Sequence, residues 1–186
     1  MITVADRNRI LWEKCAEAHG HECGGLTIGY KAALYAVELM GLAQDETGCV
    51  SAWEDLICVA ENKACSIDAI RVILGCTEER ENLIFHLTEK QIYTIFNKKT
   101  REAFRLTLKD RPEGITRENS FAYYQGMEPA EMFFAEPVQI PFPESTARQS
   151  SFVCSDCGEE APASWIRFVE GKPFCLDCFA EREDEK

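Results

Sequence analysis

The sequence lacks several features that would place it in a familiar class of protein. No apolar run approaches the roughly 20 residues of a membrane-spanning helix, and the N-terminus lacks the basic-then-apolar order of a signal peptide. There is no Ser-His-Asp set, phosphate-binding loop or dinucleotide-binding glycine motif to indicate a reaction. These absences predict a cytoplasmic protein without membrane attachment, whose chemistry rests on cysteine and histidine.

Basic residues are also scarce. The chain has 20 lysines and arginines against 32 aspartates and glutamates, a net charge of −12. Residues 151–186 alone carry 4 basic and 9 acidic side chains. Because nucleic-acid affinity depends on cations that displace counterions from phosphates, this composition argues against nucleic acid as a partner.

Cysteine, in contrast, is abundant, with ten in the chain. In a cytoplasmic protein, that number favours metals and free thiols over disulfides. Two Cys-x-x-Cys pairs near the C-terminus have the spacing of a tetrahedral structural Zn²⁺ site, while two disulfides or redox pairs are the alternative interpretation. Residues 164–174 between the pairs predict a hairpin with its turn at residues 170–172. The four predicted zinc ligands are Cys154, Cys157, Cys175 and Cys178.

Apolar periodicity and capping residues predict the secondary structure of the rest of the chain. The pattern predicts helices over 3–18, 25–40 ended by Gly41, and 67–74 capped by Ser66 and ended by Gly75. It predicts strands over 56–60, 83–87, 92–96 and 103–108, a hairpin turn at 97–100, and a mostly helical segment over 116–135 with a break near Gly126.

A second group of metal-binding residue types lies in the glycine-rich turn between the first two predicted helices. His19, His21 and Cys23 fall within five residues there, just before the positive N-terminal end of a helix. A thiol at such an end has a lowered pKa and is a better metal ligand or nucleophile. The alternative is a glycine-capped helix end with two solvated histidines.

A third stretch, residues 61–68, follows an apolar strand and precedes a helix, where functional groups collect in layered α/β structures. It contains Cys65 and Asp68, and Cys76 follows at the far end of that helix. A small buried hydrophobe is the alternative interpretation of Cys65. We interpret the other cysteines, and His86 in its predicted strand, as structural: Cys15, Cys49 and Cys58.

The segments HGHECGGLTIGYKAALYA (19–36) and ENKACSIDAIRVILGCT (61–77), with Asn82-Leu-Ile-Phe85 and the zinc cysteines, resemble the FmdE family, which is named after formylmethanofuran dehydrogenase. The resemblance covers about residues 12–108, and the zinc pairs match the longer members. It implies an α+β core that forms an intertwined homodimer, a metal or active site in that core, and a C-terminal zinc finger of treble-clef type.

Carried over by motif, the resemblance implies a core site built from four residues, with Asp68 and Cys76 near them: His19, His21, Cys23 and Cys65. The chain departs from the usual family pattern at Gly24, at Lys63 and at residues 78–81, of which only the last bears on a role in anion binding. Mixed imidazole and thiolate ligands suit a transition metal such as Zn²⁺ or Ni²⁺.

Three proline residues and a Ser/Thr-rich tail in residues 136–151 are typical of an extended linker. We therefore expect an α+β core domain over 1–140, a linker over 141–151 and a treble-clef-like zinc domain over 152–182. Such a linker is long enough to carry the zinc domain to a second protomer. The zinc domain also has more aromatic residues than a module of that size buries alone: Phe152, Trp165, Phe168, Phe174 and Phe179.

Three hypotheses of function follow. The first is a cytoplasmic metal-binding protein, with a core transition-metal site and a separate structural zinc site, that handles or senses a metal. The second is an enzyme that uses the core metal or Cys65 in metabolism related to molybdenum or tungsten enzymes, with Cys23, Cys65 and Asp68 as catalytic candidates. The third is a regulator or adaptor that binds a protein partner through the zinc finger. A coordination position open to a small molecule favours the enzyme, whereas four protein ligands favour sensing or structure.

Overall fold

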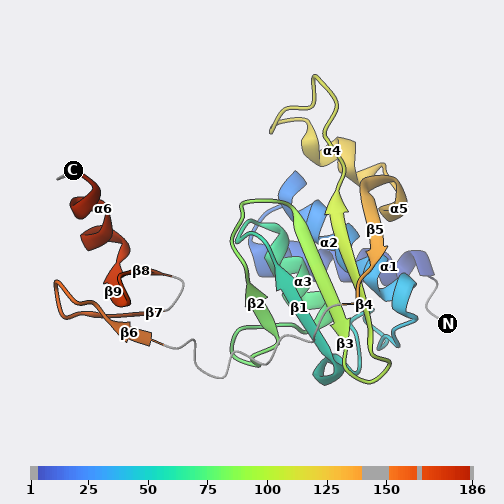
Figure 1. Ribbon diagram of the computed structural model, residues 1–186. Coiled ribbons are helices and arrows are strands. Elements are labelled where there is room, and N and C mark those ends of the chain that lie inside the picture. The colour runs from blue at the N-terminus through green and yellow to red at the C-terminus, as the bar shows by residue number, and fades with distance from the viewer. Residues whose placement is uncertain (1–3, 140–150, 163–164, 185–186) are drawn as a thin grey trace. The chain divides into compact units, whose positions relative to one another are not determined.

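The computed structural model describes residues 4–139, 151–162 and 165–184 (Figure 1). The chain divides into two compact units, residues 1–145 and 146–186. The expected linker over 141–151 falls outside the described residues, apart from Ser151. No described helix is both long enough and apolar enough to cross a membrane.

Three helices match their sequence predictions closely. They are α1 (Val4–His19), α2 (Gly24–Met40) and α3 (Ser66–Leu74). Helix α2 lies at the centre of the core unit, because α1, α3 and α4 all pack against it and most of its residues are buried. Its small residues make this possible, since Gly29 brings the backbone of α2 against the backbone of Ser66 in α3. The two helices that carry the core cysteines therefore run in close contact.

Five strands form one mixed sheet in the order β2-β1-β3-β4-β5. Strands β1 and β2 are parallel, and every other pair is antiparallel. One face of the sheet packs into the helical core, and a smaller cluster of Ile57, Phe96 and Ala103 lies on the other face. The predicted α+β class is confirmed. The strands are β1 (Leu56–Ala60), β2 (Leu83–Phe85), β3 (Ile92–Asn97), β4 (Glu102–Leu108) and β5 (Phe133–Pro137), and a 3-10 turn, η1 (Trp53–Asp55), precedes the first.

The expected helical segment over 116–135 is only partly correct. It contains two short helices, α4 (Ser120–Gln125) and α5 (Pro129–Met132), and then the first residues of β5. The side chains of Glu128 and Glu131 form a capping box around α5, which lasts a single turn. Strand β5 then pairs with β4 from Leu108 opposite Phe133 to Phe104 opposite Pro137. Pairing with the sheet edge outweighs the local helical pattern there.

Two smaller predictions also need correction. Ser66 does not cap α3, because the cap position is Cys65 and Ser66 is the first helical residue. Ser66 is buried, and its hydroxyl donates a hydrogen bond to Asn62 Oδ1 over 3.2 Å. His86 lies just beyond the end of β2 and is exposed, so it is not within a strand.

The smaller unit consists of two hairpins and a helix. Strands β6 (Ser151–Val153) and β7 (Glu160–Pro162) pair around the first cysteine pair, and β8 (Ile166–Val169) and β9 (Lys172–Cys175) form the predicted second hairpin. Its turn has two residues, Glu170 and Gly171, both with positive φ, which matches the twist of the strands. Helix α6 (Leu176–Asp184) follows directly. This knuckle, hairpin and helix order is that of the predicted treble-clef-like zinc domain.

Candidate metal centres

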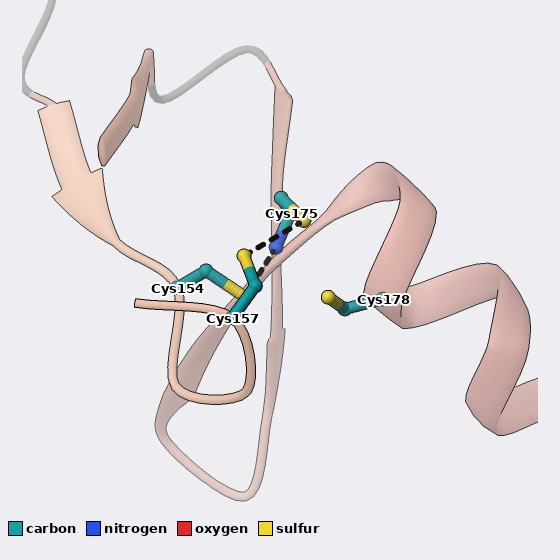
Figure 2. Close-up of side chains that lie close together, drawn as sticks. All are labelled: Cys154, Cys157, Cys175 and Cys178. Atoms are coloured by element: carbon teal, nitrogen blue, oxygen red, sulfur yellow. Dashed lines mark hydrogen bonds between the residues drawn. The ribbon is translucent and has the colours of Figure 1, made fainter. Parts of the chain in front are cut away.

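The four C-terminal cysteines converge on one point in the smaller unit (Figure 2). Cys154 and Cys157 lie in the tight turn between β6 and β7, whereas Cys175 ends β9 and Cys178 lies in the first turn of α6. Their sulfur atoms all lie within 4.8 Å of one another. Four convergent thiol groups are the donor set of a structural Zn²⁺ site, and the residues fit that ion.

Backbone groups already stabilise negative charge at this site. The N–H of Cys175 points at Cys154 Sγ over 3.4 Å. Backbone hydrogen bonds from Cys175 and Cys157 lower the pKa of Cys154 to about 6. Hydrogen bonds within the cluster, first of all with Cys175, raise the pKa of Cys178. Because four thiolates repel one another, only a cation allows all four to lose their protons, and zinc binding is expected to release protons.

A second cluster lies in the core unit and joins three chain segments. His19 is the last residue of α1, Cys23 is the N-cap of α2, and Cys65 is the N-cap of α3. Their ligand atoms lie within 4.8 Å of one another, and His19 Nε2 is 3.7 Å from Cys23 Sγ. Cys23 Sγ also accepts a hydrogen bond from the N–H of Leu26 over 3.3 Å. Both thiols thus lie at the positive ends of helices, which favours their ionised form.

A chain of charged side chains holds His19 in place. Its Nδ1 lies 2.7 Å from one carboxylate oxygen of Asp68, and the other oxygen accepts a hydrogen bond from Arg71 over 2.8 Å. Arg71 is fixed in turn by Glu78, at 2.6 and 3.2 Å. An Nδ1–H donated to a carboxylate leaves Nε2 as the metal-facing atom, an arrangement typical of zinc-bound histidines. Asp68 thus supports the cluster from behind, with both of its oxygens engaged.

Two other residues expected at or near the core site are not among these three. The ring of His21 is tilted against that of His19, with centroids 4.4 Å apart, and His21 is exposed. Cys76 is fully buried beyond the other end of α3, and burial raises the pKa of its thiol to about 12, so it is protonated at neutral pH. The buried thiols of Cys15 and Cys58 also have raised pKa values because of burial.

The absence of a side chain at residue 25 leaves space for an ion. A β-carbon at Gly25 would lie 3.6 Å from Cys65 Sγ and 3.8 Å from Cys23 Sγ, next to both candidate ligands. Burial raises the pKa of Cys65, and the nearby Cys23 adds to the effect. A cation between the two thiols would relieve this repulsion, so one imidazole and two thiolates fit a transition metal.

The cluster opens onto a cleft of about 780 Å³. Both cysteines and Gly25 line it, whereas His19 does not. The opposite wall comes from the loop before α4 and from α4 itself, and includes Arg117 and Tyr124. A fourth ligand would approach the cluster from this cleft.

Comparisons with known proteins agree with this architecture. The family model described as "FmdE, Molybdenum formylmethanofuran dehydrogenase operon" matches residues 18–132, further along the chain than the expected 12–108. A model for the prokaryotic dksA/traR C4-type zinc finger matches residues 148–184. The crystal structure of an FmdE-like protein of tungsten formylmethanofuran dehydrogenase from Syntrophus aciditrophicus is similar in fold, with a TM-score of 0.55 and 21% sequence identity. The alignment covers 91% of this chain and 90% of that one.

A curated relative from Archaeoglobus fulgidus, named as a probable S-adenosyl-L-methionine-binding protein, is 27% identical over 165 residues. That alignment covers 86% of this chain but 42% of the archaeal protein, so the chain spans less than half of that relative. The FmdE model covers more than half of the chain, and its range contains every residue of the core cluster. The chain therefore belongs to the FmdE family, with a C4 zinc finger of the dksA/traR type at its C-terminal end.

Proposed function

We propose that this protein binds two metal ions for two purposes, one that holds the zinc finger together and one in the core that keeps a coordination position open to a small molecule. The observation that carries the proposal is the convergence of His19, Cys23 and Cys65 beside a cleft. Three protein ligands with an open fourth position are typical of catalytic zinc sites, whereas structural sites are closed. The geometry therefore favours chemistry or ligand binding at the core metal over metal sensing through a closed site.

Each residue of the core site has a distinct proposed role. His19, Cys23 and Cys65 would hold Zn²⁺ or Ni²⁺, and the ion would supply a Lewis acid. Asp68 would act as a positioning residue and not as a base, because its two oxygens already bind His19 and Arg71. His21 is exposed at the cleft, where it would contact a bound molecule in place of the metal.

The test is the metal content of protein purified without an affinity tag. Wild type is expected to contain two metal ions per chain, and Cys23→Ala/Cys65→Ala is expected to contain one, because the finger keeps its own zinc. Cys49→Ala is the matched control, since Cys49 is a partly exposed cysteine outside both clusters. Equal metal content in wild type and the double variant would refute the core site.

We also propose that the protein acts as a homodimer. Within the described part of the finger, Trp165 and Phe168 remain 61% and 56% exposed, although Phe174 is buried. Exposed aromatic surface of this kind is expected to be covered by another chain. Sedimentation equilibrium should therefore report twice the chain mass of 21.1 kDa. A monomer at micromolar concentration would contradict the proposal.

A further inference from the structure

Two arginines line the cleft over the core cluster without a carboxylate partner. Arg111 follows β4 and Arg117 precedes α4, and both border the 780 Å³ cleft. Within residues 4–139, neither guanidinium forms an ion pair within 4.0 Å. Other arginines of the same unit do pair with carboxylates, as Arg71 does with Asp68 and Arg105 with Glu61. The two cleft arginines thus stand out in a unit with more acidic than basic residues.

The acidic side chains of the cleft have other partners. Glu22 accepts a hydrogen bond from the indole N–H of Trp12 over 2.7 Å, and Glu118 accepts one from the hydroxyl of Thr116 over 2.6 Å. Glu118 also lies close enough to Arg117 for their charges to interact. That interaction is between exposed groups in water and is expected to be weak. Both guanidinium groups therefore keep hydrogen-bond donors for a ligand.

Tyr124 adds a neutral donor to the same wall. Its ring is buried, with 5% of the residue exposed, and it lines both this cleft and an adjoining one of about 500 Å³. Arg111 also borders both clefts. Burial raises the pKa of the Tyr124 hydroxyl, which therefore stays protonated and able to donate at neutral pH.

We propose that Arg111 and Arg117 bind the carboxylate or phosphate group of a small anionic molecule in the cleft over His19, Cys23 and Cys65. Guanidinium groups pair with such oxyanions through paired, charge-assisted hydrogen bonds. A molecule held in this way has its remaining atoms near the open side of the metal cluster, against Ile28 and Phe121. The proposal rests on the proposed core metal site, and it adds the chemical class of the ligand.

The test is calorimetric titration of the metal-loaded full-length protein with two probes, inorganic phosphate and succinate. Saturable binding of at least one probe, at one molecule per chain, is expected for wild type, and the preferred probe separates a phosphate from a carboxylate ligand. The Arg111→Gln/Arg117→Gln variant should bind that probe about tenfold more weakly or worse, because hydrogen bonds between charged groups are lost. Both side chains are exposed, so the variant is expected to fold normally.

Lys98→Gln/Lys99→Gln is the matched control. It makes the same change in net charge at the β3–β4 turn, at the opposite end of this hairpin from the strand end that leads to Arg111. This control should bind the probe as wild type does. Failure of both probes to saturate wild type, or equal affinities in the two double variants, would overturn the proposal.

Metal analysis of the same samples separates this inference from the proposed function. The arginine variant should retain two metal ions per chain, whereas Cys23→Ala/Cys65→Ala should retain one and should also bind the probe more weakly. If wild type contains only the finger zinc, the core metal proposal fails, and the two double variants still decide whether the arginines bind an oxyanion.

Discussion

Replacing Cys178 by serine is expected to release the finger zinc and to unfold residues 151–184, while the core unit stays folded. Cys178 is one of four thiols that converge on a single point, and a small module of two short hairpins and a nine-residue helix cannot stabilise itself by burial alone. Metal binding supplies the folding free energy of such modules, so loss of one ligand removes most of it.

Metal analysis together with hydrogen exchange would measure this effect. One zinc per chain should be lost, and the amides of β8, β9 and α6 should lose protection, while those of α2 and β3 keep theirs. The same result is expected for Cys154, Cys157 and Cys175, and Cys49→Ser serves as the control. Finding the four finger cysteines in disulfides in freshly prepared protein would contradict the zinc assignment.

Replacing Gly29 by alanine should destabilise the core unit by about 3 kcal/mol or more. A β-carbon there would lie 1.9 Å from the backbone oxygen of Ser66, which cannot move without shifting the start of α3. The helices would separate near the ends that carry Cys23 and Cys65. Core metal affinity is therefore expected to fall in the same variant.

Denaturant unfolding of the core unit would measure the change. Gly126→Ala is the control, because the nearest atoms to a β-carbon there are 3.8 Å away and φ is −77°. That variant should change stability by less than about 1 kcal/mol. If Gly29→Ala is as stable as the Gly126 control, α2 and α3 do not pack backbone to backbone as described.

Local patterns predicted most of the elements, because each of those elements has its own periodicity and its own end signals. Helix α2 ends at Gly41 with a left-handed conformation, and α3 ends at Gly75 in the same way, both as predicted. The strand over 133–137 could not be found from its own residues. It depends on an edge of the sheet offered by β4, a partner about 30 residues away, and long-range pairing of this kind leaves little local trace.

The core site shows the same division. Residues 19–23 attract attention in the sequence because two histidines and a cysteine lie close together there, and His21 therefore has the same weight as His19. In the fold, the turn after α1 leaves His21 exposed, and Cys65 reaches the cluster from another helix. Asp68 lies 49 residues from His19, yet hydrogen-bonds its ring. Arg111 and Arg117 carry no local signal of any kind, and only the position of their loop brings them to the cleft.

The zinc finger could be read from the sequence without any structure, because all four ligands lie in two short motifs whose spacing reflects the chemistry of one ion. The family, and the order of helices and strands up to β4, could be read in the same way. Three-dimensional packing was needed to establish which core side chains converge, which of them Asp68 supports, and which cleft they face. Those relations depend on distances between segments far apart in the chain, and they arise only when α1, α2 and α3 pack together.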